Sequence, residues 1–445
     1  MDERDLMVTP MLVIFIYVAA YLVRPLVTDL ENRKYFFPAL TMKILGALAL
    51  GFLYQFYYNG GDTFNFHTYG SRRIWEAFMD SSDLGLKLLF ADGKSEEGIY
   101  KYSSEIPFFR DSSSYTVIRI AGFLDLFTFS AYSGTAVLFS VMSFTGSWML
   151  FLTFYQKYPQ IKFVLAVAIL FIPSVIFWGS GILKDSLTLS CLGVATYEID
   201  RILMQRKFSI PHLVGLLLSL YIIFVTKKFI LQAFLPAAII WFYLSRLNAI
   251  KSVVVRVMVF PILIIFVVLG TYYAVLKVGE GDSRYDVQKL ATTAKITATD
   301  IRYHTGRDAG SGYSIGEQDG SFGTMLRLAP AAINVSLFRP YVWEVRNPLM
   351  LLSAVESMVL LVVTVYIVFR VRWRVFKYLA NPDVAFALIF AVIFAFAVGI
   401  STYNFGTLSR YKIPLLPYYA VALVLILYLD KENREAKFEE LESTE

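Results

Sequence analysis

Residues 7–26 read MVTPMLVIFIYVAAYLVRPL, a run in which Arg24 is the single charged side chain. A helix of about twenty apolar residues crosses the hydrocarbon core of a bilayer, which is roughly 30 Å thick. Acids and one arginine stand before the run, in residues 1–5, so it lacks the basic segment that opens a signal peptide. It therefore predicts a retained membrane-spanning helix.

The rest of the chain repeats this pattern. Hydrophobic residues make up 57% of the 445 residues, charged residues only 17%, and the mean hydropathy is +0.57. A soluble domain carries roughly a quarter charged residues. We expect an all-α polytopic membrane protein, a single membrane domain over residues 1–445, with about eleven spans and a range of about ten to thirteen. The predicted spans are 7–26, 36–57, 132–155, 162–179, 184–203, 211–226, 229–246, 254–277, 348–370, 383–400 and 413–429.

The basic residues predict which way the spans run, because Lys and Arg concentrate in short cytoplasmic loops. Five alternate connections carry them, and we expect these connections and the acidic tail, residues 430–445, to be cytoplasmic. The N-terminus and two large loops, about residues 58–131 and 279–347, are then on the outer, non-cytoplasmic side. The basic residues are Arg24, Arg33, Lys34, Lys157, Lys162, Arg201, Arg206, Lys207, Arg246, Lys251, Arg256, Arg370, Arg372, Arg374 and Lys377.

Both large loops contain helical patterns. Mixed apolar and polar spacing in the first loop predicts short helices in the plane of the membrane interface, at 74–78, 84–90 and 117–129. The stretch 117–129 has an alternative interpretation as a twelfth span, which would move the N-terminus inside. In the second loop we expect a polar helix over 283–303, followed by a Gly-rich segment at 306–323.

Three short outer connections hold basic residues where the charge rule disfavours them. Charges kept at helix ends near the headgroup level have to be paired or solvated. Together they suit a lipid phosphate or pyrophosphate, which arginine binds bidentately. The alternative is that each side chain extends to ordinary anionic lipid. The predicted donor-binding residues are Lys184, Lys227, Lys228, Arg410, Tyr411 and Lys412.

Two acids accompany these cations. Asp62 follows Gly60 and Gly61, which allow a sharp turn directly after the second predicted span. A carboxylate at an apolar interface is suited to act as a base towards a hydroxyl. Asp185 opens the fifth predicted span on the same side. We predict both as catalytic, with a turn cap as the alternative for Asp62 and a helix cap or a partner for Lys184 as the alternatives for Asp185.

At these residues the chain resembles the GT-C superfamily of membrane glycosyltransferases, which use polyprenyl-phosphate-linked sugars. The family places a catalytic acid in its first outer loop, where this chain has Asp62. Its pattern of a proline followed by an acid that opens the next span is similar to 173–187, and its Thr-Lys between two close spans is similar to 226–227. Its late Arg-Tyr with two following prolines resembles 410–417. The resemblance extends over about residues 36–430.

The resemblance implies an inverting transferase with Asp62 as its base. Many members of the family have paired acids in the first loop, whereas Asp62 has no acidic neighbour. A divalent metal, Mg²⁺ or Mn²⁺, held by Asp62 and His67, therefore stays open. Aromatic and charged residues suit contact with the sugar, although Tyr and Trp also serve as interface anchors. The predicted substrate contacts are His67, Tyr69, Arg339, Trp343 and Glu344.

The expected function is transfer of a sugar from a polyprenyl-phosphate donor to a glycan or lipid-linked acceptor. We expect the protein in membrane lipid, in a bacterial inner membrane, with its active site on the non-cytoplasmic side. Two alternatives stay open: a Wzy-like polysaccharide polymerase, and a transporter or flippase of lipid-linked sugars. A transporter typically shows ionisable residues at mid-membrane, interrupted helices or an inverted repeat. No nucleic-acid partner is expected, because the basic stretches fit the topology.

Overall fold

The computed structural model describes residues 2–93, 98–249, 289–304 and 311–442, with the single positions 269 and 273. Within them every regular element is a helix, and extended backbone pairs only at an isolated antiparallel bridge. The helices form two compact units. Unit 1 comprises Met1–Lys157, Val175–Ile199 and Ser209–Lys227, and unit 2 comprises Tyr158–Ser174, Asp200–Phe208 and Lys228–Glu445.

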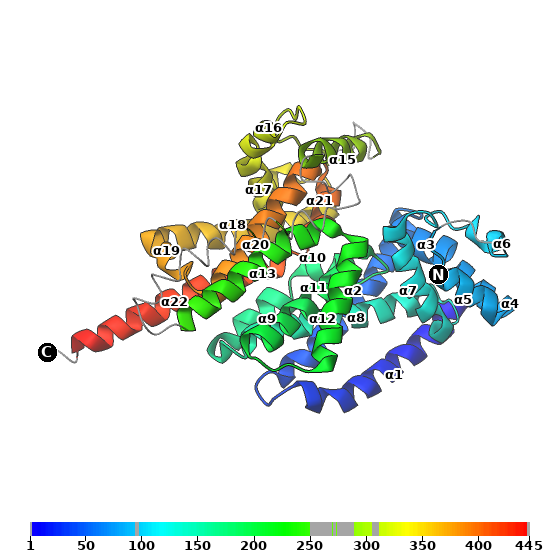
Figure 1. Cartoon of the computed structure of the whole chain (residues 1–445), viewed down its shortest axis with the longest axis horizontal. Helices are drawn as coiled ribbons and strands as arrows, with labels where there is room; N and C mark the ends of the chain where they lie inside the picture. The colour runs from blue at the N-terminus through cyan, green and yellow to red at the C-terminus, as the bar shows by residue number, and fades with distance from the viewer. Residues whose placement is uncertain are drawn as a thin grey trace. The chain divides into compact units, whose positions relative to one another are not determined.

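The described part of unit 1 contains three helices of at least 20 residues and a group of shorter ones (Figure 1). The second long helix, α2, ends in a π-helical turn at Leu53–Tyr57. The helices of unit 1 are α1 (Glu3–Val27), α2 (Arg33–Phe52), α3 (Asp62–Phe66), α4 (Arg72–Asp80), α5 (Ser82–Phe90), α6 (Tyr100–Ser103), α7 (Ser112–Thr128), α8 (Tyr132–Tyr155), α11 (Lys184–Ile199) and α12 (Ile210–Thr226), with a second π-helical turn at His67–Ser71.

Unit 2 contains the later apolar helices. The border between the units passes through α10 (Pro173–Trp178). Unit 2 holds α9 (Lys162–Leu170), α13 (Lys228–Ala249), α15 (Leu290–His304), α16 (Phe322–Arg327), α17 (Ala329–Phe338), α18 (Pro348–Val371), α19 (Val375–Tyr378), α20 (Pro382–Ser401), α21 (Phe405–Tyr411) and α22 (Leu416–Glu442), with short turns η3 (Pro159–Ile161), η4 (Asp200–Met204), η6 (Val342–Glu344) and η7 (Arg372–Arg374).

Six described helices are long and apolar enough to cross a membrane, or seven if α21 and α22, bent by 67°, count as one span. The protein is thus an all-helical membrane protein, as the composition predicts. The bent pair contains the predicted span 413–429, and the predicted span 254–277 lies outside the described residues. The six helices match the predicted spans 7–26, 36–57, 132–155, 229–246, 348–370 and 383–400.

The remaining predicted spans differ from single long helices. The stretch 162–179 is interrupted after Leu170 and continues as α10 from Pro173. Proline disfavours helical backbone at the residue before it and lacks an N–H for the helix ladder, which explains the break. α11 has 16 residues and continues directly into the π-helical turn η4, and α12 has 17 residues, at the lower end of the roughly 17–25 that a span needs. The number of eleven spans therefore stays a prediction.

Small residues set the close packing of α8 on α11. A Cβ added to Gly146 would lie 2.2 Å from the carbonyl oxygen of Ser190, and one added to Gly193 would lie 2.1 Å from the carbonyl oxygen of Gly146. The Ser190 hydroxyl donates a 2.6 Å hydrogen bond to the carbonyl of Met142. Because residue numbers rise together along this contact, the two helices run parallel. Close approach over small side chains is typical of packed membrane helices.

A contact between polar side chains at each end joins α11 to α12, and the two helices lie side by side in opposite directions (Figure 1). At one end the Lys227 ammonium lies 2.5 Å from the Asp185 carboxylate. At the other end His212 Nδ1 lies 2.6 Å from Glu198 Oε2. The end of unit 1 at which α8 and α11 begin and α12 finishes is called the polar end below.

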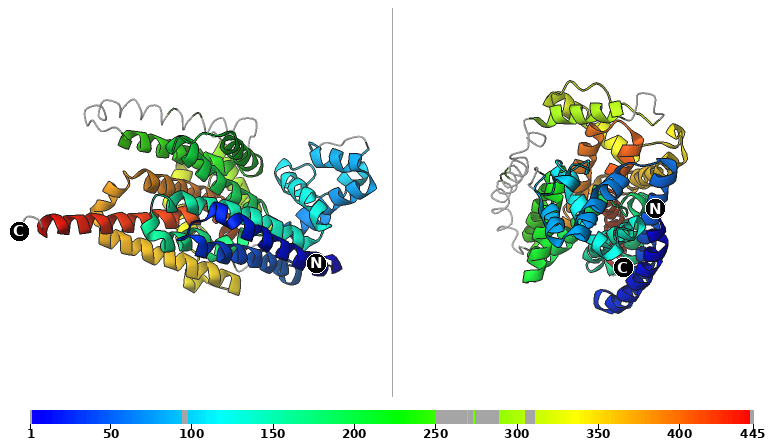
Figure 2. Two further views of the ribbon diagram at one scale, coloured as in Figure 1. Left: turned by 90° about the horizontal axis from the view of Figure 1, so that it is seen from below. Right: turned by 90° about the vertical axis from the view of Figure 1, so that its right-hand side faces the viewer.

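Both ends of α7 lie at this polar end. Asp111, which caps the start of α7, forms an ion pair with Lys184 at the start of α11. Asp125, near the end of α7, accepts a hydrogen bond from Thr135 in the first turn of α8. α7 therefore lies across the polar end instead of running along α8, which argues against the twelfth span. The helices of residues 62–128, blue to cyan, gather near the start of α1 (Figure 2).

A buried lysine joins α2 to its neighbours in unit 1. Lys43 is completely buried, and its Nζ donates to the Ser143 hydroxyl at 2.9 Å. It also donates to the carbonyls of Val175 and Gly179, at 3.0 and 3.3 Å. These carbonyls belong to the last turn of α10, where a cation is favoured by the helix dipole. The ammonium is thus satisfied by three oxygen acceptors, one on α8 and two at the end of α10, and none of them belongs to an acid.

We predict that Gly146→Ala lowers the stability of the protein in detergent. The added methyl group meets the backbone of Ser190, which has no flexible atoms to move aside. Overpacking of this kind costs about 1–3 kcal/mol. Thermal unfolding in detergent measures it. The matched control is Gly323→Ala on α16, where an added Cβ meets nothing within 4 Å. Equal melting temperatures for the two variants would contradict the close α8–α11 contact.

Candidate functional site

The buried ion pair of Asp185 and Lys227 is the centre of the polar end. The Asp185 side chain is 0% exposed and that of Lys227 is 9% exposed. Asp185 is the second residue of α11, and Lys227 directly follows α12. Removing one partner of such a pair leaves an uncompensated buried charge. The first function of these two residues is therefore to hold the ends of α11 and α12 together.

Lys184 lies beside this pair and faces α7. Its Nζ donates to the Ser113 hydroxyl at 2.6 Å and lies 3.4 Å from Asp111 Oδ2. Burial raises the pKa of Asp111, but bonds from Ser114 and the charge of Lys184 outweigh it and hold that pKa below its usual value. The Lys184 side chain is 19% exposed, so this cation is held in place without being fully buried.

Asp62 is the first residue of α3 and directly follows a turn formed by Gly60 and Gly61. Gly60 and Gly61 have φ values of 130° and 116°, a region that favours glycine. The Asp62 side chain is half-buried. The next residue, Thr63, accepts a 2.9 Å hydrogen bond from the hydroxyl of Tyr132 at the start of α8. This contact brings Asp62 to the polar end.

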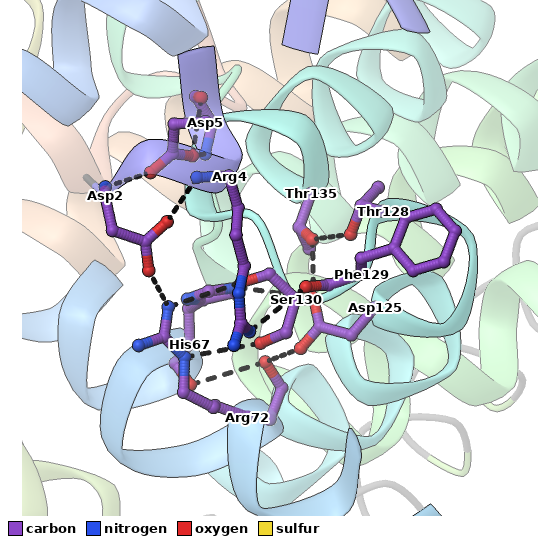
Figure 3. A network of polar contacts seen from close by, with 12 residues as sticks. Asp2, Arg4, Asp5, His67, Arg72, Asp125, Thr128, Phe129, Ser130 and Thr135 are labelled. Atoms are coloured by element: carbon purple, nitrogen blue, oxygen red, sulfur yellow. Dashed lines mark hydrogen bonds and ion pairs between the residues drawn. The ribbon is translucent and has the colours of Figure 1, made fainter. Parts of the chain in front are cut away.

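His67 belongs to a buried network that the sequence analysis did not foresee (Figure 3). Its Nε2 lies 3.3 Å from Asp125 Oδ1, and both side chains are completely buried. Asp125 also accepts hydrogen bonds from the hydroxyls of Ser71, at 2.6 Å, and Thr135, at 2.5 Å. The imidazole packs edge-on against Tyr132. His67 is thus oriented towards α7 and α8 in the interior, which argues against direct contact with a substrate.

The same network ties the N-terminus of α1 to the polar end (Figure 3). Arg72 forms an ion pair with Asp2 at 3.1 Å and donates to the carbonyl of Ser130 at 3.3 Å. Arg4 donates to the carbonyl of Phe129 at 3.3 Å. These bonds fix the turn between α7 and α8, and with it the position of the residues around His67.

A second candidate cluster lies in unit 2, around Arg339. Its Nε lies 3.1 and 3.0 Å from the two carboxylate oxygens of Glu344. The guanidinium centre lies 5.4 to 5.9 Å from the ring centres of Phe405, Tyr313 and Tyr341. Burial raises the pKa of Glu344, but the bond from Arg339 outweighs it and keeps that pKa below its usual value. The result is a fixed cation surrounded by aromatic faces.

Trp343 and Lys412 border this cluster in different ways. The Trp343 ring stacks on Tyr341 with centres 4.8 Å apart and is 75% exposed. Lys412 is completely buried, and its Nζ donates to the Ser357 hydroxyl at 2.8 Å and to the carbonyl of Arg339 at 3.3 Å. The exposed ring is available to a ligand, whereas the buried ammonium joins helices.

Glu356 on α18 also lies near Lys412, and the two attract each other electrostatically. Its carboxylate accepts a 2.9 Å hydrogen bond from the backbone N–H of Ser174 at the start of α10. The remaining predicted residues are placed as follows: Tyr69 is exposed in the turn His67–Ser71, Lys228 is half-buried at the start of α13, and Arg410 and Tyr411 are half-buried at the end of α21.

The structure thus brings the predicted residues together in two groups, one in each unit. In unit 1 the polar end collects Asp62, His67, Lys184, Asp185 and Lys227, and in unit 2 a cluster collects Arg339, Trp343, Glu344 and Lys412. The sequence analysis missed Asp111 and Ser113, although an aspartate before Ser112–Ser114 is a recognisable N-cap pattern. It also missed Ser71 and Thr135, whose roles depend on tertiary contacts alone.

Metal binding at Asp62 and His67 is the prediction that the geometry supports least. In the described part of the chain, no three or more His, Cys, Asp or Glu side chains are close enough to hold a metal ion. His67 lies against Asp125. A metal at these two residues would need ligands of other types, so it stays a prediction.

Comparison with known proteins gives no match. No family model matches the chain, and neither curated proteins nor solved structures are significantly similar to it.

We predict that Lys227→Met destabilises the protein strongly, because it leaves the Asp185 carboxylate buried without its partner. Breaking such a pair costs about 3–5 kcal/mol. Adding Asp185→Asn to the same variant removes the stranded charge and should restore much of the loss. Thermal unfolding in detergent compares the two. A double variant no more stable than Lys227→Met would contradict the mutual compensation.

The matched control is Lys87→Met on α5. Lys87 pairs with Asp83 at 2.7 Å, but both side chains are more than half exposed. Exposed pairs of this kind contribute about 0.3–0.5 kcal/mol. The control should therefore melt close to the parent.

Proposed function

We propose that the protein is a membrane glycosyltransferase that moves a sugar from a polyprenyl-phosphate donor to an acceptor hydroxyl on the non-cytoplasmic face. The observation that carries this proposal is the gathering of a half-buried carboxylate, Asp62, and a partly exposed ammonium, Lys184, at one end of unit 1. A base and a fixed cation are the two groups that displacement of a phosphate requires.

In the proposed reaction Asp62 takes the proton of the acceptor hydroxyl. The acceptor oxygen attacks the anomeric carbon from the side opposite the phosphate, and the bond from that carbon to the phosphate oxygen breaks. The leaving phosphate keeps the electron pair, and the configuration at the sugar inverts. Lys184 stabilises the developing negative charge, because Ser113 and Asp111 hold its ammonium in place before the reaction begins.

Asp185 and Lys227 act in this proposal as positioning residues. Their pairing fixes the first turn of α11, from which Lys184 extends. The sequence alone favoured direct roles for both, but a completely buried carboxylate beside a lysine is better suited to support than to contact with a substrate. Trp343 of unit 2 is exposed, and a sugar ring can stack on its face. The resemblance of residues 410–417 to the family's late Arg-Tyr pattern is the reason to test Arg410 as a phosphate ligand.

A transporter of lipid-linked sugars is the second candidate. Ionisable side chains within apolar helices favour it: Lys43 lies in α2 and Glu356 in α18, both membrane-length helices. Such residues often mark ion or substrate pathways. Against this, Lys43 is saturated by its three hydrogen bonds. A Wzy-like polymerase would use the same chemistry with a pyrophosphate donor, so the leaving group distinguishes it from the first proposal.

The direct test starts with mass spectrometry of lipids that co-purify with the protein, followed by an assay with the lipid so identified. We predict that Asp62→Asn reduces release of polyprenyl phosphate by about 10²–10⁴-fold, the effect of losing a positioned base. Asp83→Asn, an exposed acid on α5, is the control and should keep parental activity. Transport without release of the lipid phosphate would support the transporter, and activity of Asp62→Asn near the parent would remove Asp62 from the mechanism.

We also predict that Arg410→Lys weakens use of the donor although it keeps the charge, because lysine lacks the planar fork that binds phosphate bidentately. Arg410→Ala should weaken it further, by about 1.5–3 kcal/mol for a lost charge-assisted hydrogen bond. The measurement is the KM for the donor. Arg327→Lys on α16, an exposed site, is the control. Unchanged KM values for both Arg410 variants would show that this side chain does not bind the donor.

A further inference from the structure

An excess of positive charge surrounds Asp430 in unit 2, far along the chain from the proposed site residues. The Asp430 side chain is completely buried, and arginine nitrogens lie 2.9 Å away from Arg434, 3.2 Å from Arg374 and 3.8 Å from Arg370. The Tyr378 hydroxyl donates to the same carboxylate at 3.0 Å. Three positive charges against one negative charge leave a net charge of +2. This group is called the arginine cluster below.

Two of the acids that follow on α22 have partners outside the cluster. Glu432 accepts a hydrogen bond from the Tyr428 hydroxyl, and Glu435 lies 3.5 Å from the ammonium of Lys431. Each therefore has its own partner on the same helix.

The arginines are held in place, yet their charged groups still reach the surface. Arg374 and Arg434 both donate to the carbonyl of Arg370, at 3.2 and 3.3 Å. The exposed fractions of the three side chains are 39% for Arg370, 46% for Arg374 and 38% for Arg434. A guanidinium carries five N–H donors. The acceptors recorded for these three side chains are the Asp430 carboxylate, the Arg370 carbonyl and the hydroxyl of Tyr366, which accepts from Arg370 Nη1. These are fewer acceptors than the three guanidinium groups have donors, so donors remain for an anion.

Exposed aromatic rings stand directly beside the cluster. Trp373 is 80% exposed and Phe376 is 63% exposed, and their rings stack with centres 6.1 Å apart. Phe369, 76% exposed, lies in the last turns of α18, a helix long enough to cross a membrane. Tryptophan beside arginine at the end of an apolar helix is typical of the level of the lipid headgroups.

We propose that the arginine cluster binds the phosphate of an anionic phospholipid, with Trp373 and Phe376 against the first carbons of its acyl chains. Guanidinium groups bind phosphate oxygens in parallel pairs of hydrogen bonds. Basic clusters next to membrane-spanning helices recognise anionic headgroups. The fixed geometry around Asp430 adds selectivity, because the donors are oriented before the lipid arrives. This site is independent of the proposed glycosyl transfer.

The test measures binding of phosphatidylglycerol to the purified full chain in a neutral detergent by native mass spectrometry, with phosphatidylcholine as the neutral comparison. We expect the parent to prefer phosphatidylglycerol, and the variant Arg374→Gln with Arg434→Gln to bind it roughly ten- to thirtyfold more weakly. Lys431→Gln is the matched control: it removes a charge from the same helix outside the cluster, and it should bind like the parent.

A second measurement does not depend on the stability of the arginine variants. Brominated phosphatidylglycerol should quench part of the tryptophan fluorescence of the parent, and that part should be missing in Trp373→Phe. Equal binding of the two lipids, unchanged binding by the double variant, or displacement of phosphatidylglycerol by millimolar inorganic phosphate would each overturn the proposal. The last outcome would show that the cluster is a site for free phosphate.

Discussion

The buried ion pair between Asp185 and Lys227 is the contact on which the candidate site in unit 1 depends. It closes the hairpin of α11 and α12 at the end where Lys184 leaves the first turn of α11. Burying either charge without the other would strongly destabilise the protein, so the ends of α11 and α12 lie together. Lys184 then falls opposite Asp111 and Ser113 on α7. One electrostatic requirement thereby positions several residues of the site.

Other buried charges of the protein are compensated by different kinds of partner. Lys43 has no acid and is satisfied by oxygen acceptors, two of them carbonyls at the end of α10. Asp430 is satisfied by three arginines and a tyrosine, more cations than a single carboxylate needs. The three acceptors of Lys43 match its three N–H donors, so this lysine has a structural role. Asp430 has three arginines around one carboxylate, and this excess of positive charge is the basis of the proposed lipid site.

The short helices of unit 1 position the residues of the proposed site. The described residues of the predicted first outer loop include the helices α3 to α7. α7 lies across the ends of α8 and α11, with polar residues at both of its own ends. Asp62 owes its position to the glycine turn before it and to the contact between Thr63 and Tyr132 after it. The described helices of this segment thus cover the polar end, where the Asp62 carboxylate and the Lys184 ammonium come from distant parts of the chain.

The sequence by itself determined the class of the protein, most of its long helices and the residues worth inspecting. Apolar runs of membrane length, and basic residues that break the predicted charge pattern, are local features of the sequence, and each can be recognised without knowing what packs against it. The partners of those charges were decided only by tertiary structure. Lys227 pairs with Asp185 across a hairpin, and the His67 ring lies against Asp125, more than fifty residues later in the chain, because the packing of the helices brings these buried groups within reach of each other.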